Sequence, residues 1–317
     1  MLGKELNQSI CLKEYITEKE YKEITELKEF CSSNDKVNLK LGLHYKLNMP
    51  KSSEIELENI NEFLYYIDEV LVAYLGISCF GGNIGEISGM THPNWRRKGI
   101  FKKLFELGRD ECKNRNFNKI LLLSDGKSSS GIEFIKIVNG NYDFSEYRMK
   151  RFNKVSSESM NSINLRKAVK LDKKEIGKQN TMFFNDIEEI ENFQEEDVEE
   201  SESIQKVDID GIGSSAEGEE RLNEGIYMVE LKGETIGKIN VEYSDNVAFI
   251  FGFGILPDFR GKGYGKAALK EALCIINEKN IYEIELDVEC KNNTALNLYK
   301  SCGFEEQSVM NYYKYYI

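Results

Sequence analysis

Apolar and polar residues follow two different periods along this chain, and the two periods predict strands and helices. Period-two alternation or short apolar runs predict strands at residues 62–67, 70–79, 119–124, 225–231, 235–243 and 282–289. Apolar residues spaced by three and four positions predict helices at residues 17–30 and 172–184 and after Pro93 and Pro257. Hairpins are expected across Asp68-Glu69 and across residues 232–234. This mixture predicts an α/β (α+β) fold.

A short pattern occurs twice, about half a chain length apart. Residues 93–101 read P-N-W-R-R-K-G-I-F and residues 257–265 read P-D-F-R-G-K-G-Y-G, so proline, an aromatic residue, arginine, lysine and glycine recur 164 positions apart. Each copy follows a strand-like segment and opens an amphipathic helix, after which another strand is predicted. Each half therefore predicts a β-α-β crossover that is parallel and right-handed.

A polar segment separates the two copies. Residues 153–162, N-K-V-S-S-E-S-M-N-S, have the composition of a linker. A chain of 317 residues is long enough for two domains of ordinary size. We expect tandem domains at residues 1–156 and 157–317, each with a mixed central sheet flanked by helices.

The overall charge limits the partners. The chain has 54 acidic and 42 basic residues and a formal charge of −12, which argues against a general affinity for nucleic acid or an anionic membrane and favours a cationic substrate. Its seven cysteines show no C-x-x-C spacing, so neither a disulfide framework nor a zinc site is indicated. The sequence begins without a signal-like leader and has no long apolar run, so we expect a cytoplasmic protein.

The second copy of the pattern has the chemistry of a phosphate-binding loop. Gly261, Gly263 and Gly265 allow backbone amides to approach phosphate oxygens, and the loop ends at a helix N-terminus with its partial positive charge. Arg260 and Lys262 add full charges. The spacing matches neither a P-loop nor a Rossmann fingerprint. A tight strand-to-helix turn that merely uses glycine is the alternative.

A second motif lies after the loop. Residues 292–304 contain the string N-x-x-A-x-x-L-Y-x-x-x-G-F. Together with the arginine and glycine loop, this string resembles the GNAT family of N-acetyltransferases, strongly from about residue 163 onwards and faintly in the first half. The resemblance implies direct transfer of an acetyl group from acetyl-CoA to an amine, without a covalent enzyme intermediate and without a metal.

The resemblance also implies roles for individual residues. Backbone groups of Phe253, Gly254 and Ile255 would pair with the pantetheine arm and orient the acetyl carbonyl. The pyrophosphate would be held by Arg260, Gly261, Lys262, Gly263, Tyr264 and Gly265. Asn292 would contact the CoA arm, and Tyr299 would protonate the departing thiolate. The alternatives are an ordinary helix N-cap for Asn292 and a core aromatic residue for Tyr299.

The strand at residues 282–289 offers candidates for the general base. Its apolar residues alternate with Glu283, Glu285, Asp287 and Glu289, so one face is expected to be open to water, as a substrate cleft would require. Asp287 stands five residues before Asn292, where some members of the family have a carboxylate base, and is the leading candidate. Glu285 and Glu289 are the alternates, and a solvated strand face is the other interpretation.

The first half departs from the pattern. Arg97 replaces a loop glycine, Phe101 occupies the last small position, and Ile135 stands where the tyrosine would be. Arg96, Lys98 and Gly99 are retained, so binding of CoA there stays open. We expect one active site, in the second half, with a first half that is structural, regulatory or substrate-capping.

The acceptor is the least defined part. Residues 186–202 are rich in aspartate and glutamate, which would attract a polyamine, an aminoglycoside or a basic peptide; a solvated acidic segment is the alternative. Two classes of function stay open. One is an N-acetyltransferase that acts on a small-molecule or peptide amine. The other is a non-catalytic acyl-CoA-binding module for sensing or assembly. Nothing in the sequence indicates an oligomeric state.

Overall fold

The computed structural model describes residues 6–49, 59–79, 84–152, 163–184, 225–244 and 246–317. The chain divides into two compact units, unit 1 (Met1–Glu146 with Ser308–Ile317) and unit 2 (Tyr147–Gln307). Strand β6 (Asn141–Arg151) therefore begins in unit 1 and ends in unit 2, while the last residues of the chain belong to unit 1. The predicted boundary at residue 157 lies outside the described residues, and the division at 156 and 157 stays a prediction.

The sheet of unit 1 has its strands in the order β1-β2-β3-β4-β5-β12. The bounds are β1 Gln8–Lys13, β2 Glu62–Ile67, β3 Val70–Ser78, β4 Ile84–Thr91, β5 Lys119–Asp125 and β12 Glu305–Tyr316. All neighbours are antiparallel except β4 and β5, which are parallel as the crossover predicts. The β2–β3 turn uses Asp68 and Glu69 at φ 45° and 67°, the left-handed conformations typical of a tight hairpin.

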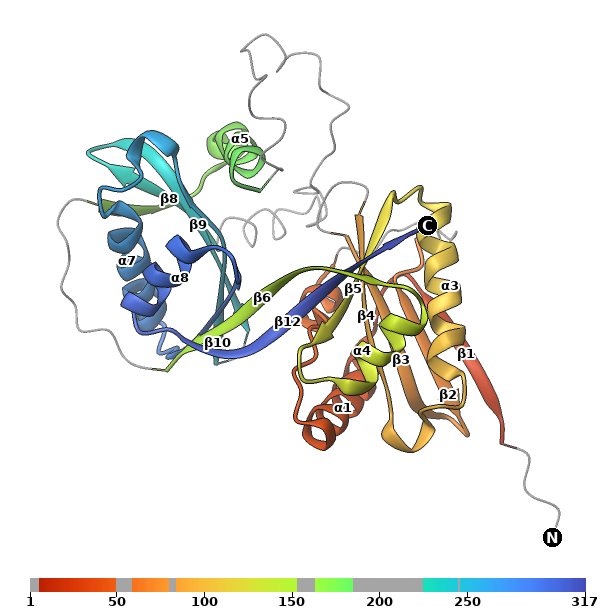
Figure 1. Cartoon of the computed structure of the whole chain (residues 1–317). Coiled ribbons are helices and arrows are strands. Elements are labelled where there is room, and N and C mark those ends of the chain that lie inside the picture. The colour runs from red at the N-terminus through yellow and green to blue at the C-terminus, as the bar shows by residue number, and fades with distance from the viewer. Residues whose placement is uncertain (1–5, 50–58, 80–83, 153–162, 185–224, 245) are drawn as a thin grey trace. The chain divides into compact units, whose positions relative to one another are not determined.

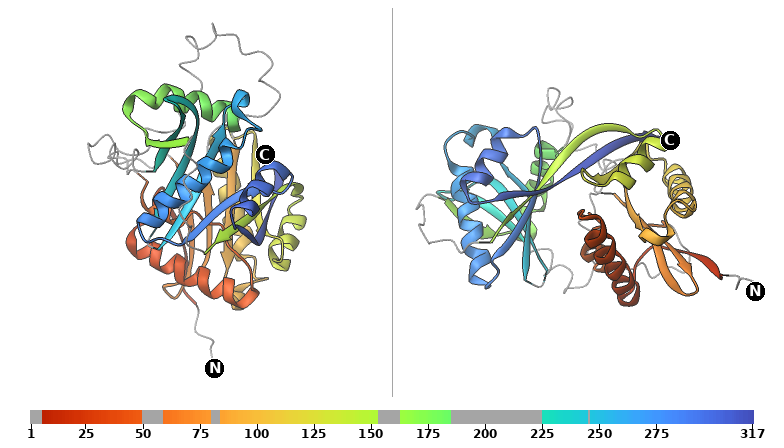
Figure 2. Two further views of the ribbon diagram at one scale, coloured as in Figure 1. Left: turned by 90° about the vertical axis from the view of Figure 1, so that its left-hand side faces the viewer. Right: turned by 60° about the horizontal axis from the view of Figure 1, so that its bottom comes forward.

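Helices cover both faces of this sheet (Figure 2). The bounds are α1 Glu18–Asp35, α2 Leu43–Leu47, α3 Ile100–Asn114 and α4 Ser129–Ile137. Helix α1 begins with a capping box between Thr17 and Glu20. Its apolar face packs on Leu64, Leu71 and Tyr74, whereas α3 packs with α4 on the other set of strand residues. Each face of the sheet therefore has its own apolar core.

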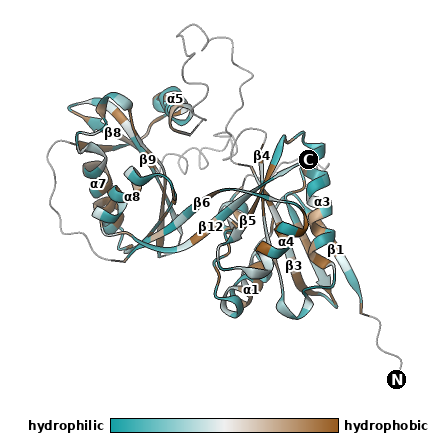
Figure 3. Ribbon diagram, in the orientation of Figure 1, coloured by the Kyte–Doolittle hydropathy of each residue, from teal (hydrophilic) through white to brown (hydrophobic). Residues whose placement is uncertain are grey.

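The sheet of unit 2 has the order β6-β11-β10-β9-β8-β7. The bounds are β7 Ile163–Lys167, β8 Ile226–Leu231, β9 Glu234–Ser244, β10 Val247–Ile255 and β11 Glu283–Glu289, with helices α5 Lys173–Phe184, α7 Tyr264–Glu278 and α8 Asn293–Ser301. Figure 1 labels these helices beside the strands of unit 2. Helices α7 and α8 bury their apolar sides in one core, and α5 contributes Ile176 to a smaller cluster with Met228. In Figure 3 the helices carry both hydrophilic and hydrophobic residues, as expected for amphipathic helices.

Among the described residues, no helix is both long and apolar enough to cross a bilayer.

Candidate functional site

Two parallel strands of unit 2 separate next to the glycine-rich loop. Strand β10 pairs with β11 only from Val247 to Ile250, although β10 continues to Ile255 and β11 to Glu289. Beyond Ile250 the β11-facing edge of β10 therefore has no strand partner in this ladder. Such crevices at the carboxyl ends of parallel strands are common ligand sites. Phe253, Gly254 and Ile255 lie on this stretch.

A β-bulge interrupts β10 at the same place. Phe251 pairs with Asn240 of β9 and Gly254 pairs with Lys238, so Gly252 and Phe253 together stand opposite a single residue of β9. Gly252 has φ +55°, a left-handed conformation that explains the glycine.

The backbone direction after the bulge is fixed by two hydrogen bonds. The Leu256 N–H donates to the Ile236 carbonyl of β9 at 2.9 Å. Backbone groups alternate between the two edges of a strand, so those of Ile255 face away from β9. The Arg260 Nε donates to the Ile255 carbonyl at 2.7 Å and ties the following loop to this edge.

The loop itself carries cations and left-handed glycines. Gly261 and Gly263 have φ +73° and +83°, and a Cβ on either would meet nothing within 4 Å, so the backbone conformation and not crowding requires glycine. Gly263 is the N-cap of α7, whose first N–H groups are therefore directed at the loop. The Lys262 Nζ donates to the Asp258 carbonyl at 2.8 Å. Among the described residues, no carboxylate pairs with Arg260 or Lys262, which leaves their charge available to an anion.

Helix α8 contributes the next two predicted residues. The Asn292 Oδ1 accepts from the Ala295 N–H at 3.0 Å, so the side chain is the N-cap that the alternative interpretation expected. Tyr299 is 9% exposed and packs edge-on against Phe304, with ring centroids 6.0 Å apart. Burial raises the pKa of Tyr299 to about 12. The described part of the chain provides no hydrogen-bond acceptor for its hydroxyl, which is thus protonated and able to donate to a ligand.

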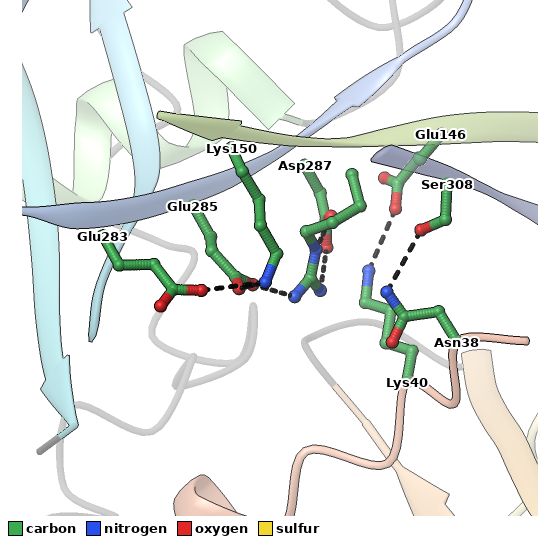
Figure 4. A network of polar contacts seen from close by, with 9 residues as sticks. Asn38, Lys40, Glu146, Lys150, Glu283, Glu285, Asp287 and Ser308 are labelled. Atoms are coloured by element: carbon green, nitrogen blue, oxygen red, sulfur yellow. Dashed lines mark hydrogen bonds and ion pairs between the residues drawn. The ribbon is translucent and has the colours of Figure 1, made fainter. Parts of the chain in front are cut away.

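A charged cluster occupies the polar face of β11 (Figure 4). The Arg148 Nε and Nη2 donate to the two Asp287 carboxylate oxygens at 2.5 and 2.9 Å, and Nη1 donates to Glu285 at 2.6 Å. Lys150 pairs with Glu283 at 2.9 Å and Glu285 at 2.6 Å. Burial lowers the pKa of Arg148, but Asp287 and Glu285 outweigh burial and hold this pKa above its usual range.

The polar face of β11, expected to be open to water, is partly covered by two cations, and Glu283, Glu285 and Asp287 are partly exposed. Strand β6 places two cations against the carboxylates, and the Arg148 guanidinium also lies 5.0 Å from the Phe249 ring centroid. Glu289, at the end of β11, is exposed. Sequence reasoning missed Arg148 and Lys150 because both precede the predicted boundary. The signal that could have found them is the alternation of the apolar residues Tyr147 and Met149 with Arg148 and Lys150.

The corresponding loop of unit 1 has a similar backbone. Strand β4 pairs with β5 only over Ile84 to Ile87, and the Arg96 Nε donates to the Thr91 carbonyl at 2.9 Å, 164 positions before the Arg260 bond. Arg97 has φ 62°, close to that of Gly261, so the turn has the same conformation although unit 1 has arginine where unit 2 has glycine. The local shape of the loop therefore survives in unit 1.

The loop of unit 1 differs from that of unit 2 in its ion pairs and in the packing around it. The Arg96 guanidinium donates to both carboxylate oxygens of Asp35 at 3.1 and 2.6 Å, and this bond lowers the pKa of Asp35. Arg97 pairs with Glu133 at 3.2 Å. The Phe101 ring packs on Phe134 at 4.9 Å, and β4 pairs with β3 in continuous register without a bulge. Two cations of this loop, Arg96 and Arg97, are thus paired with carboxylates, and Phe101 and Phe134 pack together beside it.

The C-terminal half of the chain matches a family model. Residues 184–304 match the model described as the acetyltransferase (GNAT) family. This segment is therefore similar to the GNAT family. An uncharacterised N-acetyltransferase of Methanocaldococcus jannaschii is 31% identical over 99 residues, which cover 29% of this chain and 43% of that protein. An uncharacterised N-acetyltransferase of Bacillus subtilis is 38% identical over 69 residues, which cover 22% of this chain and 44% of that protein. The chain thus spans less than half the length of these two GNAT relatives.

A relative with a stated substrate and two solved structures extend the comparison. The [ribosomal protein bS18]-alanine N-acetyltransferase of Escherichia coli is 27% identical over 101 residues, which cover 32% of this chain and 66% of that protein. A GCN5-related N-acetyltransferase from Sphaerobacter thermophilus has a TM-score of 0.71 at 15% identity, covering 97% of this chain and 95% of that one. A tandem GNAT protein from the clavulanic acid biosynthesis pathway has a TM-score of 0.61 at 11% identity, with 98% of both chains covered. These likenesses show a tandem GNAT fold over the whole chain.

Proposed function

We propose that this chain is an acetyl-CoA-dependent N-acetyltransferase whose single active site lies in unit 2. One observation carries the proposal: the separated ends of β10 and β11 meet a loop whose two cations have no carboxylate partner among the described residues. In unit 1 the equivalent arginine is already paired with Asp35. A pyrophosphate would satisfy the loop of unit 2 and would compete with Asp35 in unit 1.

The residues of unit 2 fit acetyl-CoA by their chemistry. Arg260, Lys262 and the first N–H groups of α7 are suited to the pyrophosphate, and the free edge of β10 is suited to the amide groups of the pantetheine arm. When bound, acetyl-CoA supplies the thioester whose acetyl group is transferred. Backbone groups of Phe253 and Ile255 would orient its carbonyl, whereas those of Gly254 face β9 because backbone groups alternate along the strand. Asn292 caps α8 through Oδ1, so its Nδ2 is left for the CoA arm.

Tyr299 is proposed as the general acid. The thiolate that leaves when the carbon–sulfur bond breaks has a pKa of about 8.5 and needs a proton donor at neutral pH. The Tyr299 phenol is buried, protonated and without an acceptor in the described part of the chain, so it can donate there. Its neighbour Phe304 limits the movement of the ring.

Asp287 as the general base stays a prediction. Both of its carboxylate oxygens accept from Arg148, so this contact has to open, or exchange for a water, before Asp287 takes a proton from the amine. Glu285 is similarly engaged by Arg148 and Lys150, and Glu289 is exposed. A substrate amine that loses its proton to water would need none of the three.

The acceptor is proposed to be a primary amine of a small molecule or a peptide. The likeness to an enzyme that acts on an alanine of a ribosomal protein supports including peptide amines. The charge of −12 favours cationic acceptors. The acidic residues 186–202, predicted to contribute, lie outside the described residues.

Thiol release from acetyl-CoA against a panel of polyamines, aminoglycosides and peptides tests the proposal. We expect release that depends on one class of amine and that Arg260→Ala and Tyr299→Phe each reduce strongly. Turnover that survives both changes together would contradict the assignment. Binding of acetyl-CoA without turnover on any amine would favour the non-catalytic module.

A further inference from the structure

Lys238 of β9 is a lysine whose side chain is completely buried. Its exposed fraction is 0%, and its Nζ donates to the Gly252 carbonyl at 3.0 Å. Lysine is almost never fully buried, because removing an ammonium group from water costs free energy. Burial lowers the pKa of Lys238 to about 8. Because burial of this ammonium group costs free energy, we looked for a role of Lys238 in the contacts that it makes.

The acceptor of this hydrogen bond is the bulge of β10. Gly252 is one of the two bulged residues and has φ +55°. A Cβ on Gly252 would lie 2.6 Å from the Asn240 Nδ2 and 3.1 Å from the Lys238 Nζ, so both side chains press on the bulged backbone. The Asn240 Oδ1 is also buried and has no hydrogen-bond partner in the described part of the chain. Polar side chains of β9 thus fill the space directly against the bulge.

Unit 1 shows what this position contains when there is no bulge. Tyr74 pairs with Met90 of β4 as Lys238 pairs with Gly254 of β10, 164 positions later in both strands. The Tyr74 hydroxyl donates to Glu62 at 2.5 Å, and Lys46 pairs with the same carboxylate at 2.7 Å. The strand beside Tyr74 keeps a continuous register. Within the described residues, a buried lysine at this position therefore occurs together with the bulge.

The bulge matters because of its place in β10. The bulge, formed by Gly252 and Phe253, changes the alternation of the strand by one residue within the segment 253–255 that is proposed to hold the thioester. A backbone carbonyl fixed by an ammonium group has less freedom to return to regular pairing with β9. The hydrogen bond from Lys238 is therefore suited to keep the edge of β10 in one arrangement.

We propose that Lys238 is a positioning residue for acetyl transfer, which holds the Gly252 carbonyl and thereby fixes the bulge that presents the edge of β10 to the acetyl thioester. This inference rests on the proposed function. Lys238 need not touch acetyl-CoA. Its effect passes through Gly252 to the backbone groups at 253–255, so it concerns the acetyl end of the cofactor and not the pyrophosphate.

The test compares Lys238→Met with Gly252→Ala in the full chain. Each change disturbs the bulge, the first from the side chain and the second from the backbone. We expect kcat to fall about ten- to a hundredfold in both, because small misplacements of reacting groups have effects of this size. The double variant should lose little more than either single one, since both remove the same arrangement. Lys167→Met removes an exposed lysine of β7 in the same unit and should keep wild-type kcat.

A binding measurement separates positioning from general loss of structure. The affinities for CoA and for acetyl-CoA are measured by calorimetry for each variant. In Lys238→Met we expect the affinity for CoA to stay as in the wild type and the contribution of the acetyl group to affinity to be lost. A variant that is merely misfolded would lose affinity for both ligands.

The outcomes are distinguishable. Wild-type kcat in Lys238→Met, or equal loss of affinity for CoA and acetyl-CoA, overturns the role of Lys238 and leaves the proposed function intact. Failure of the wild-type protein to bind either ligand overturns both.

Discussion

Arg148 and Asp287 stand 139 residues apart in the sequence and form a two-point ion pair in unit 2, with contacts of 2.5 and 2.9 Å. Arg148 comes from β6, which begins in unit 1, and Asp287 comes from β11. The strand that carries the predicted base is therefore completed by a segment that precedes the predicted domain boundary. The polar side of β11 is organised by this pairing.

Removal of the arginine should destabilise unit 2. In Arg148→Met, Asp287 and Glu285 lose a partner while remaining only 13% exposed, so the free energy of unfolding should fall by about 1–3 kcal/mol. Urea denaturation followed by circular dichroism measures this. Arg109→Met removes an exposed pair with Asp110 and should change stability by less than about 0.5 kcal/mol. Equal effects of the two changes would contradict a structural role for the Arg148 cluster.

The effect of Tyr299→Phe should appear in kcat and not in cofactor binding. Loss of a general acid typically costs about 10²- to 10⁴-fold in rate. The affinity for acetyl-CoA should be unchanged, because the ring and its packing on Phe304 remain. Since the pKa of Tyr299 is about 12, its ionisation should add no falling limb to the pH profile of kcat below about pH 10. Tyr282→Phe, which removes an exposed hydroxyl, is the matched control. A normal kcat in Tyr299→Phe would mean that Tyr299 is an aromatic residue of the core and not the general acid.

Local pattern predicted most of the elements correctly, because hairpins and amphipathic helices depend on neighbouring residues. The turn at Asp68 and Glu69 joins β2 and β3 as expected, and the parallel pairing of β10 with β11 confirms the crossover. The strand–loop–helix repeat is present in both units. The distinction between the two loops was also visible in the sequence at Arg97 and Phe101.

Strand partners and register could not be read from the sequence. Pairing of β12 with β5 joins residues far apart in the chain, and many alternating segments could have taken either place. The bulge at Gly252 is likewise a matter of register between β9 and β10. Lys238 alternates with apolar residues and so has the pattern of a solvent-facing position, although its side chain is completely buried. Only tertiary packing reveals this.

Replacement of Arg260 and replacement of Arg96 should affect different properties of the protein. Arg260→Ala should weaken acetyl-CoA binding by about ten- to a hundredfold, which corresponds to about 1.5–3 kcal/mol for a charged hydrogen bond. Arg96→Ala should leave this affinity unchanged but destabilise unit 1, because Asp35 loses its partner at 2.6 Å. Calorimetry gives both the affinity and the stoichiometry, expected to be one acetyl-CoA per chain. Two molecules per chain, or weaker binding in Arg96→Ala, would show that unit 1 also binds the cofactor.

Asp287→Asn tests the proposed base. If Asp287 takes the proton of the amine, the variant should lose rate at every pH at which the substrate amine is protonated, and the loss should shrink as the amine deprotonates by itself. The measurement is acetyl transfer between about pH 6 and 10, with Glu289→Gln, at the exposed end of β11, for comparison. Full rate in Asp287→Asn across this range would show that Asp287 is not the general base.

Lys238 should also affect how stability depends on pH. Its pKa is about 8 in the folded protein, below the usual value of 10.5, because burial disfavours the ammonium form. Between these values the unfolded chain binds a proton that the folded chain lacks, so this group makes the free energy of unfolding rise with pH. The slope is about 1.4 kcal/mol per pH unit for one proton. In Lys238→Met this rise is absent, whatever the variant's stability at neutral pH. Urea denaturation of both proteins is measured at a series of pH values from about 7 to 10. The free energy of unfolding of the wild type should increase relative to that of the variant only above about pH 8. If the difference in free energy of unfolding between the two proteins is the same at every pH, Lys238 titrates like an exposed lysine.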